Sequence, residues 1–459
     1  MKAPVSFLLA IMVWTTAAHG AIAISGRPVP TMTAFDGIMS NYMQTSGITA
    51  GLLGIMRDGR TVYLRGFGNL PTSEPFPENA TFRIASLSKP VTAAAIRMLA
   101  SDGAFGANGI DRKAFNLTVN GTNNGGLLSI TPFQSLGDSR MAQITIRHLL
   151  DHTSGFDGPD CIFRDGSRQV ANDLGLNAPP SRVDRIRWML HQTLTSTPGT
   201  NFVYSNFGFM VLGHIIDTYG GGYINFIRNR VLTAALWVPT ADVNHGRTLV
   251  GNRLPREPGY TITGNGQSVF DYSPPIDSLP YPYGGEFDLE ALLGAGSLVA
   301  SGHAMLTFAN GWHLWYPNAG VPVTQGFPQE GYIHDGGLSG LNTRLQGRGD
   351  GVSIYLAFNR VDSVGPPFDS ISALIDSGTG FTWPSTTSDG FWVSLPESDP
   401  TAGYGGYHSL WQGFGSSLTK ASDGTRMRLK PGTSPWTGRI TKRIRLDAPE
   451  GVARLGVQP

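Results

Sequence analysis

The chain has 459 residues, of which 40% are hydrophobic and 15% are charged, and its formal net charge is +1. A chain of this length and apolar content can bury a large core, and a net charge so close to zero argues against a nucleic-acid partner. Sixty glycines and 31 prolines indicate many turns and long loops, which excludes a simple helical bundle.

The first residues have the pattern of a secretory signal peptide. Lys2 precedes an apolar run from Phe7 to Trp14, and small residues follow. Cleavage after Gly20 or Ala23 fits the small-residue requirement. The alternative is an uncleaved membrane anchor, but the run is shorter than the ~20 residues that a spanning helix needs. We therefore assign residues 1–23 to a signal peptide and expect a secreted or periplasmic protein with no integral membrane segment after cleavage.

The predicted helices and strands place one hairpin near each end of a single domain. Apolar residues at helical spacing predict helices at Thr31–Gln44, Leu87–Ser101, Ile144–His152, Val183–Gln192, Asn206–Tyr219, Leu289–Leu293, Ser301–Trp312 and Phe368–Asp376. Strand-like runs joined by glycine-containing turns predict two strand pairs: Ile48–Met56 with Thr61–Phe67, and Asn342–Gln346 with Val352–Asn359. Residues 104–140 and 240–290 are expected to be loops.

This order of elements predicts an α+β fold. One antiparallel β-sheet is built from both ends of the domain over residues 30–380, with helices against it and an all-helical lobe inserted between the hairpins. Residues 381–459 are expected to form a Gly/Pro/aromatic linker and a small β-rich basic extension. Residues 420–459 carry nine Lys or Arg against three acidic residues. This excess is a candidate contact for an acidic polymer, although a solvated strand face is the favoured interpretation.

The stretch from Ile84 to Ala95 places two serines and a lysine where a helix is about to begin. Ser86 and Lys89 have the S-x-x-K spacing, and residues i and i+3 share one face of a helix. A lysine with a lowered pKa can take the proton of a serine hydroxyl. Alternatively, Ser86 or Ser88 is only a helix N-cap. The spacing recurs at Ser417-Leu418-Thr419-Lys420, in a tail where no helix is expected, so the motif alone is weak evidence.

Two further segments carry candidate chemistry. Tyr204 and Asn206 follow a Pro-Gly turn, at the junction between a loop and an apolar helix, where side chains can face a cleft. The Tyr-x-Asn spacing also recurs at Tyr223 and Tyr316, so it too is weak by itself. The segment His334-Asp335-Gly336-Gly337 leads into a predicted strand, and its glycines let a substrate approach backbone N–H groups closely.

Together these motifs resemble those of the serine β-lactamase and penicillin-binding-protein superfamily, in particular its class C-like branch. S-x-x-K, Y-x-N and H/K-x-G occur in the order of that family. The flanking stretches Phe82–Ser86, Ile144–Gly155 and Gly294–Leu298 are also similar to it, and the resemblance covers residues 30–380.

The resemblance implies a role for each motif residue. Ser86 would attack a carbonyl group and form an acyl-enzyme, while Lys89 and Tyr204 would share the base and acid duties. Asn206 would contact the substrate. The backbone N–H groups of Ser86 and Gly337 would form the oxyanion hole. No cofactor is implied.

The third motif departs from the family pattern at two positions. His334 stands where many relatives carry lysine, and a neutral histidine supplies less positive charge, so that Tyr204 should be harder to deprotonate. Asp335 stands where β-lactam-recognising relatives typically carry threonine, and a carboxylate there should repel anionic substrates. Arg344 can compensate by binding a carboxylate. The sequence therefore favours an esterase or D-amino-acid peptidase over a β-lactamase, with His334 and Asp335 as substrate-binding residues.

No metal site and no disulfide are expected. His148 and His152, at i and i+4, have the spacing of a zinc pair, but no third ligand accompanies them, so helix packing is favoured. Cys161 is the only cysteine of the chain and cannot form an intrachain disulfide.

Two classes of function remain open. The first is a serine hydrolase that acts on a small-molecule, peptide or ester substrate. The second is a catalytically weak, penicillin-binding-like module that binds peptidoglycan or another polymer. The presence of Ser86, Lys89 and Tyr204 together favours the enzyme, because a pure binder has no need of all three.

Overall fold

The structure is a computed structural model that describes residues 21–70, 76–232, 238–324, 327–361, 364–384, 391–395, 411–421, 425–429, 432–448 and 453–456. The expected signal peptide lies outside the described residues except for residues 21–23. Within these ranges, no helix combines the length and the apolar character of a membrane span.

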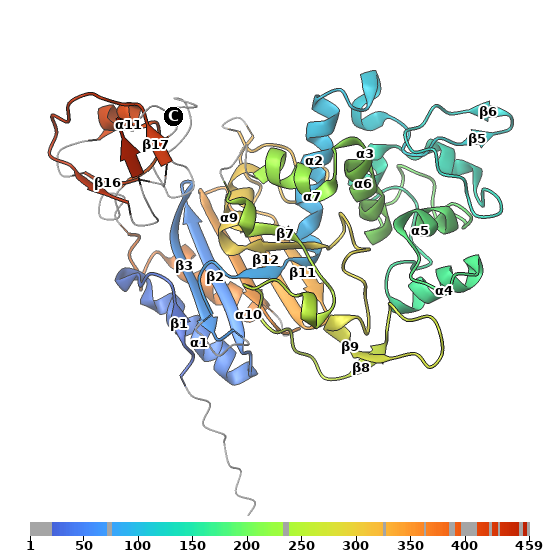
Figure 1. The fold of residues 1–459 in the computed structure, drawn as a ribbon, viewed down its shortest axis with the longest axis horizontal. Helices are drawn as coiled ribbons and strands as arrows, with labels where there is room; N and C mark the ends of the chain where they lie inside the picture. Colours follow the sequence, from blue (N-terminus) through green and yellow to red (C-terminus); the bar gives the residue numbers. More distant parts are fainter. Residues whose placement is uncertain are drawn as a thin grey trace, which may run out of the picture.

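Strands from both ends of the domain meet in the central sheet, as predicted (Figure 1). Its six described strands have the order β1-β3-β2-β13-β12-β11 and are antiparallel throughout. The strands are β1 (Ile24–Ser25), β2 (Ala50–Arg57), β3 (Arg60–Gly68), β11 (Ile333–Leu338), β12 (Leu341–Gly347) and β13 (Val352–Phe358). Strand β11 at the edge was not predicted as a strand.

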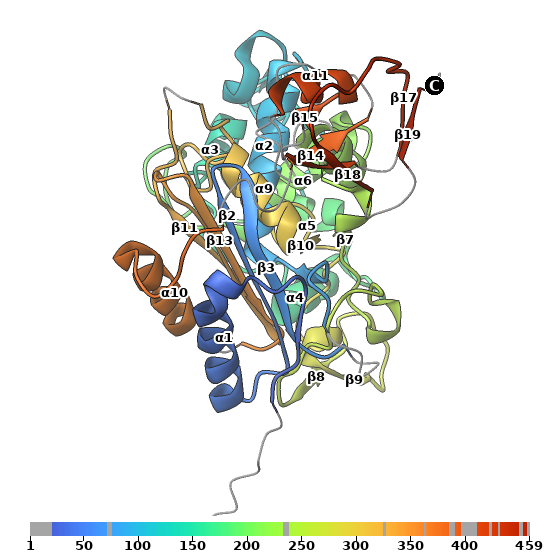
Figure 2. The same cartoon turned by 90° about the vertical axis from the view of Figure 1, so that its left-hand side faces the viewer.

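Helices cover both faces of this sheet. Helix α1 (Thr33–Ser46) and helix α10 (Gly365–Ser377) lie together on one face, as Figure 2 shows. In α1, Phe35, Met39 and Met43 recur every fourth residue and are fully buried, and the helix ends at Gly47, whose φ is +67°. Helix α9 (Gly302–Gly311) packs against β2 and β13 on the opposite face.

The inserted lobe is helical, as predicted. It contains α2 (Ser88–Ser101), α3 (Ile146–Leu150), α4 (Arg164–Leu174), α5 (Arg182–Met189), α6 (Asn206–Tyr219) and α7 (Tyr223–Phe226). Helix α4 was not predicted, because Val170, Ala171 and Leu174 are its only apolar side chains and most of its other residues are polar. Helices α2 and α6 pack directly against each other, which brings the Ser86 and Tyr204 segments to one place.

A second small sheet connects the lobe to the start of α2. Its strands are β4 (Thr81–Arg83), β10 (Leu298–Ser301) and β7 (Val243–His245), and none of them was predicted. The fully buried Arg83 of β4 holds part of residues 240–290 against this strand. Its guanidinium donates to the carbonyl oxygens of Arg247, Thr248 and Pro282.

The predicted helix Leu289–Leu293 is wrong, because this stretch forms turns. Gly294 follows it with a φ of +81°, which lies outside the helical region and prevents the segment from continuing as a helix.

The C-terminal extension is β-rich, as expected. It contains β14 (Phe391–Ser394), β15 (Trp411–Gln412), β16 (Arg426–Leu429) and β18 (Arg445–Asp447) in one sheet, and β17 (Gly432–Ser434) paired with β19 (Ala453–Leu455). Val393, Phe414 and Met427 belong to its own apolar cluster. The expectation that Ser417–Lys420 lacks helical context is wrong, since this segment ends helix α11 (Phe414–Lys420). The division into residues 30–380 and 381–459 stays a prediction.

Candidate active site

Ser86 lies at a sharp bend between a strand and a helix. It belongs to the short 3-10 turn Ala85–Leu87 between β4 and α2. Ala85 has a φ of +46°, a conformation that costs a residue with a Cβ about 1 kcal/mol. The bend persists because the N–H of Ile84 donates to the carbonyl oxygen of Leu298 over 2.9 Å, which fixes the backbone from the side of β10.

The two serines of the first motif have different roles, and neither side chain caps a helix. Ser88 is fully buried, and its Oγ accepts the backbone N–H of Leu298 over 3.1 Å. Ser86 instead has its Oγ 3.0 Å from the Nζ of Lys89. Ser88 therefore connects α2 to β10, while Ser86 is the serine whose hydroxyl meets a base.

Lys89 contacts three oxygen atoms from separate parts of the chain. Besides Ser86, its Nζ lies 2.8 Å from Oδ1 of Asn206 and 2.8 Å from the carbonyl oxygen of Ala295. Burial lowers the pKa of Lys89 to about 7, so that a large fraction of the amine is neutral near neutral pH. A neutral amine has two N–H donors, which suit Asn206 and Ala295, and one lone pair, which is left for the Ser86 hydroxyl proton.

Tyr204 reaches the same serine from the N-terminal side of α6. The Nζ of Lys89 lies 4.7 Å from the centroid of its ring. Loss of water around the hydroxyl raises the pKa of Tyr204 to about 12, and a hydrogen bond with Ser86 opposes this rise. The residue as a whole is 39% exposed, so it is the surroundings of its hydroxyl that raise the pKa. Tyr204 is thus protonated at neutral pH and suited to donate a proton, while Lys89 is suited to accept one.

His152 supports Tyr204, which the sequence did not indicate. Its ring stacks on the ring of Tyr204 with centroids 4.6 Å apart and planes 23° apart, and its Nδ1 accepts the backbone N–H of Ser205 over 3.0 Å. Burial, together with the charge of Lys89, lowers the pKa of His152 to about 3. The nearby His148 has a separate role, because its Nδ1 accepts the backbone N–H of Thr145 in a capping box. The sequence placed His152 at the end of a predicted helix and within the family-like stretch Ile144–Gly155, but it gave no sign of the contact with Tyr204.

Strand β11 brings the third motif to Ser86, and successive side chains of this strand lie on opposite faces of the sheet. His334 is 3% exposed, and burial, assisted by the charge of Lys89, lowers its pKa to about 4, so it is neutral as expected. Gly336 lies on the same face, where a Cβ would approach the carbonyl oxygen of Ile84 and Oγ1 of Thr343 closer than 3.0 Å. The edge strand can therefore lie against the Ser86 turn only because this residue is glycine.

The structure does not bring Asp335 to this site. Side chains alternate along a strand, so Asp335 lies on the opposite face from His334. Its carboxylate accepts two hydrogen bonds from Arg344, the cross-strand neighbour on β12, over 2.7 and 2.8 Å. The guanidinium of Arg344 lies 5.2 Å from the ring centroid of Phe368 on α10. The expected repulsion of anionic substrates by Asp335 therefore has no geometric basis, and Arg344 is engaged by Asp335 itself.

The predicted oxyanion hole joins Ser86 to Gly337. Gly337 lies on the edge strand β11 in register with Asn342, and a Cβ built on it meets no atom within 4 Å. The strand packs against the turn that holds Ser86. This placement is compatible with two converging backbone donors, and their role in catalysis stays a prediction.

One cavity of about 270 Å³ adjoins the site. It is bordered by Tyr204, Ser205 and Asn206 on one side and by residues 156–163 on the other, which include the exposed Asp157 and Asp160.

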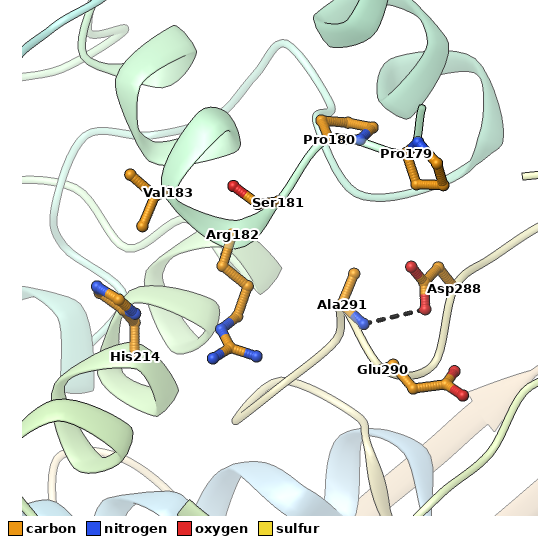
Figure 3. Close-up of a pocket in the computed structure, with 9 residues that line it drawn as sticks. All are labelled: Pro179, Pro180, Ser181, Arg182, Val183, His214, Asp288, Glu290 and Ala291. Atoms are coloured by element: carbon orange, nitrogen blue, oxygen red, sulfur yellow. Dashed lines mark hydrogen bonds between the residues drawn. The ribbon is translucent and has the colours of Figure 1, made fainter. Parts of the chain in front are cut away.

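Another cavity, of about 390 Å³, shares no lining residue with the predicted site (Figure 3). Arg182, His214 and Asp288 are among the residues that line it, and burial lowers the pKa of His214. Burial and the neighbouring Glu290 raise the pKa of Asp288.

Parts of the chain are similar in sequence to known proteins. The chain is 28% identical over 174 residues to Penicillin-binding protein 4* of Bacillus subtilis (strain 168), which covers 37% of this chain and 32% of the relative. It is 24% identical over 214 residues to Esterase EstB of Burkholderia gladioli, covering 45% of this chain and 50% of the relative. The chain thus matches 32% to 50% of the length of these curated relatives.

The fold is also found in a solved structure. The D-amino acid amidase of Ochrobactrum anthropi SV3 in complex with D-phenylalanine is 20% identical, with a TM-score of 0.50, and the match covers 75% of this chain and 99% of that one. At this identity the similarity concerns the fold. The Beta-lactamase family model matches residues 35–417, from helix α1 into helix α11, and the chain therefore belongs to the Beta-lactamase family.

Proposed function

We propose that the protein is a secreted serine hydrolase that forms an acyl-enzyme on Ser86 and hydrolyses ester or uncharged amide bonds. The observation that carries this proposal is the contact of Lys89 with Ser86 over 3.0 Å, at a lysine whose pKa burial lowers to about 7. A base of this pKa within hydrogen-bond reach of a serine is what nucleophilic catalysis near neutral pH requires.

The proposed reaction uses the hydrogen-bond partners of Ser86 and Lys89 as follows. The neutral amine of Lys89 takes the proton of Ser86 as its Oγ attacks the substrate carbonyl. The oxyanion that forms is stabilised by the backbone N–H groups of Ser86 and Gly337, each worth about 3 kcal/mol in comparable sites. Tyr204 then gives its proton to the leaving alcohol or amine and regains one from Lys89. A water molecule releases the acyl group by the reverse sequence of proton transfers.

The preference for esters over β-lactams now depends on His334 instead of Asp335. A neutral residue next to Lys89 provides no fixed positive charge for a substrate carboxylate, in contrast to the lysine of the class C-like pattern. The similarity to Esterase EstB supports an esterase, and the fold shared with a D-amino acid amidase is compatible with a D-amino-acid peptidase. Secretion is supported by the pattern of residues 1–23 alone.

A fluorophosphonate probe tests the proposal. We expect wild-type protein to be labelled once and Ser86→Ala to be unlabelled with an unchanged unfolding midpoint. Ser88→Ala is the matched control: it should keep its label but lose about 1 kcal/mol of stability with the hydrogen bond to Leu298. An unlabelled wild-type protein would refute the enzyme and favour the polymer-binding module. Hydrolysis of a chromogenic cephalosporin faster than of p-nitrophenyl acetate would refute the preference for esters.

A further inference from the structure

Three aromatic side chains beside the site are exposed or partly exposed although they are large and apolar. They are Phe202, Trp315 and Tyr316, and we call them the aromatic wall. Phe202 is 41% exposed, and its ring stacks on that of Tyr316 with centroids 4.3 Å apart and planes 20° apart. Grouped apolar surface that stays in contact with water is typical of a binding site.

The chain that carries Trp315 and Tyr316 is fixed on the helix that carries Lys89. A Cβ on Gly320 would lie closer than 3.0 Å to the backbone of α2 at Ala94, so this loop packs directly on the helix. Arg97 of α2 donates to the carbonyl oxygens of Pro317 over 2.6 Å and Ala319 over 2.8 Å. The two rings therefore have a defined position relative to the catalytic lysine.

The aromatic wall continues directly into the catalytic residues. The ring of Trp315 lies 6.5 Å from that of Tyr204, with the planes only 15° apart, and 4.9 Å from that of His334. A substrate whose carbonyl carbon reaches Ser86 would therefore have one of its two substituents next to Trp315.

We propose that the aromatic wall binds the leaving group of the substrate, and that the preferred substrates are esters or amides whose alcohol or amine carries an aromatic ring. This inference rests on the proposed function. The reason is the place of the proton donor: Tyr204 must lie within hydrogen-bond reach of the leaving oxygen or nitrogen to protonate it. The group attached to that atom then lies on the Tyr204 side, where Trp315 presents a ring for stacking.

The cavity of about 270 Å³ is the other place next to Tyr204 where this group can lie. Its exposed edge carries the carboxylates of Asp157 and Asp160, which an aromatic ring would have to desolvate. The aromatic wall has no carboxylate among its three members and is the better match for an uncharged ring.

Three esters separate the possibilities: methyl acetate, benzyl acetate and methyl phenylacetate. The first pair differs only in the leaving alcohol, while the first and third differ only in the acyl group. For each enzyme variant, kcat/KM is divided by the wild-type value for the same ester, which cancels the intrinsic reactivity of the ester. Because kcat/KM reports formation of the acyl-enzyme, it contains the contact with the leaving group.

We expect Trp315→Ala to lower kcat/KM about tenfold for benzyl acetate and less than about threefold for the other two esters. Trp315→Leu, which fills more of the space, should show the same pattern if Trp315→Ala folds poorly. Tyr219→Ala is the matched control, an exposed aromatic residue at the far end of α6, about 20 Å from Asn206, and should leave all three values unchanged.

Other results would overturn the inference. An equal loss on all three esters would assign Trp315 a general role, and a larger loss on methyl phenylacetate would place the acyl group at the aromatic wall. Phe163 lines the cavity of about 270 Å³. A selective fall of kcat/KM for benzyl acetate in Phe163→Ala, but not in Trp315→Ala, would place the leaving group in that cavity. A wild-type protein that hydrolyses none of the esters and takes no fluorophosphonate label would overturn the proposed function itself.

Discussion

The ring of His152 stacks on the ring of Tyr204, and Nδ1 of His152 accepts the backbone N–H of Ser205, the residue that follows Tyr204. A single neutral side chain thus fixes both the ring of the expected proton donor and the backbone that carries it. His152 touches no reacting atom in this arrangement, so its contribution is to position Tyr204.

Substitution of His152 tests this role. His152 has a φ of +57°, which asparagine tolerates better than alanine, so His152→Asn should be about 1 kcal/mol more stable than His152→Ala. Both variants lose the stacked ring, and we expect kcat for ester hydrolysis to fall about 10-fold to 100-fold in both. A loss of activity that follows stability, small in His152→Asn and large in His152→Ala, would show that His152 only supports the fold. Thermal unfolding and ester kinetics provide the two measurements.

The pKa of Lys89 predicts the pH dependence of activity. If the neutral amine is the base, kcat/KM should rise about tenfold per pH unit below pH 7 and become constant above it. The pKa of Tyr204, about 12, predicts no decline up to about pH 10. A pH–rate profile of ester hydrolysis checks both limbs, and a fall in kcat/KM between pH 7 and 9 would contradict the assignment.

The same pKa predicts how stability changes with pH. The folded state lowers the pKa of Lys89 from its ordinary value of 10.5 to about 7, so between these values the unfolded chain binds more protons. Stability should therefore increase as pH rises from 7 to 10, on the order of a few kcal/mol from this group. Lys89→Met removes this pH dependence. The free energy of unfolding of the variant should therefore exceed that of the wild type most below pH 7, and the difference should shrink as pH rises. Denaturant unfolding of both proteins at pH 6, 8 and 10 measures the difference.

Substitution of Asp335 tests whether its carboxylate acts on the substrate. Its carboxylate is held by Arg344 away from the catalytic face, so Asp335→Asn should change hydrolysis of both neutral and anionic esters by less than about threefold. Because the pair is partly exposed, stability should fall by no more than about 1 kcal/mol. If Asp335→Asn selectively accelerates anionic substrates, the carboxylate acts on the substrate after all.

Two adjacent glycines on β11 provide a matched pair. A Cβ on Gly336 would collide with the carbonyl oxygen of Ile84, whereas one on Gly337 meets nothing within 4 Å. Gly336→Ala should therefore push β11 away from the Ser86 turn, with a loss of about 1–3 kcal/mol and of most fluorophosphonate labelling. Gly337→Ala should unfold at the wild-type midpoint. Equal midpoints for the two variants would mean that β11 does not pack against the turn as described.

The elements that the sequence predicted well have strong local patterns. Phe35, Met39 and Met43 recur at helical spacing, and the first hairpin is joined by the Asp58-Gly59 turn. Strand β11 was missed because two of its six residues are glycines, which are rare in strands. Because the strand was not predicted, the face on which Asp335 lies could not be predicted either. That face follows from the alternation of side chains along a strand.

The candidate catalytic residues could be named from the sequence, while their geometry could not. The motif order pointed to Ser86, Lys89 and Tyr204, and the structure brings all three together. The choice of Ser86 over Ser88 depends on the contact with Leu298, and the support of Tyr204 depends on the conformation of His152. Such contacts join residues that are distant in the sequence, and no local pattern contains them.

If Ser86 is the nucleophile, as we propose, the contacts of Lys89 also determine when it becomes reactive. Two of its acceptors, on Asn206 and Ala295, lie 117 and 206 residues further along the chain. Without them the amine is solvated and charged, and Ser86 is an ordinary alcohol. A fluorophosphonate probe therefore counts only molecules whose folding has closed these long loops. Its labelling rate during refolding would time the closing of these loops, with no spectroscopic signal required.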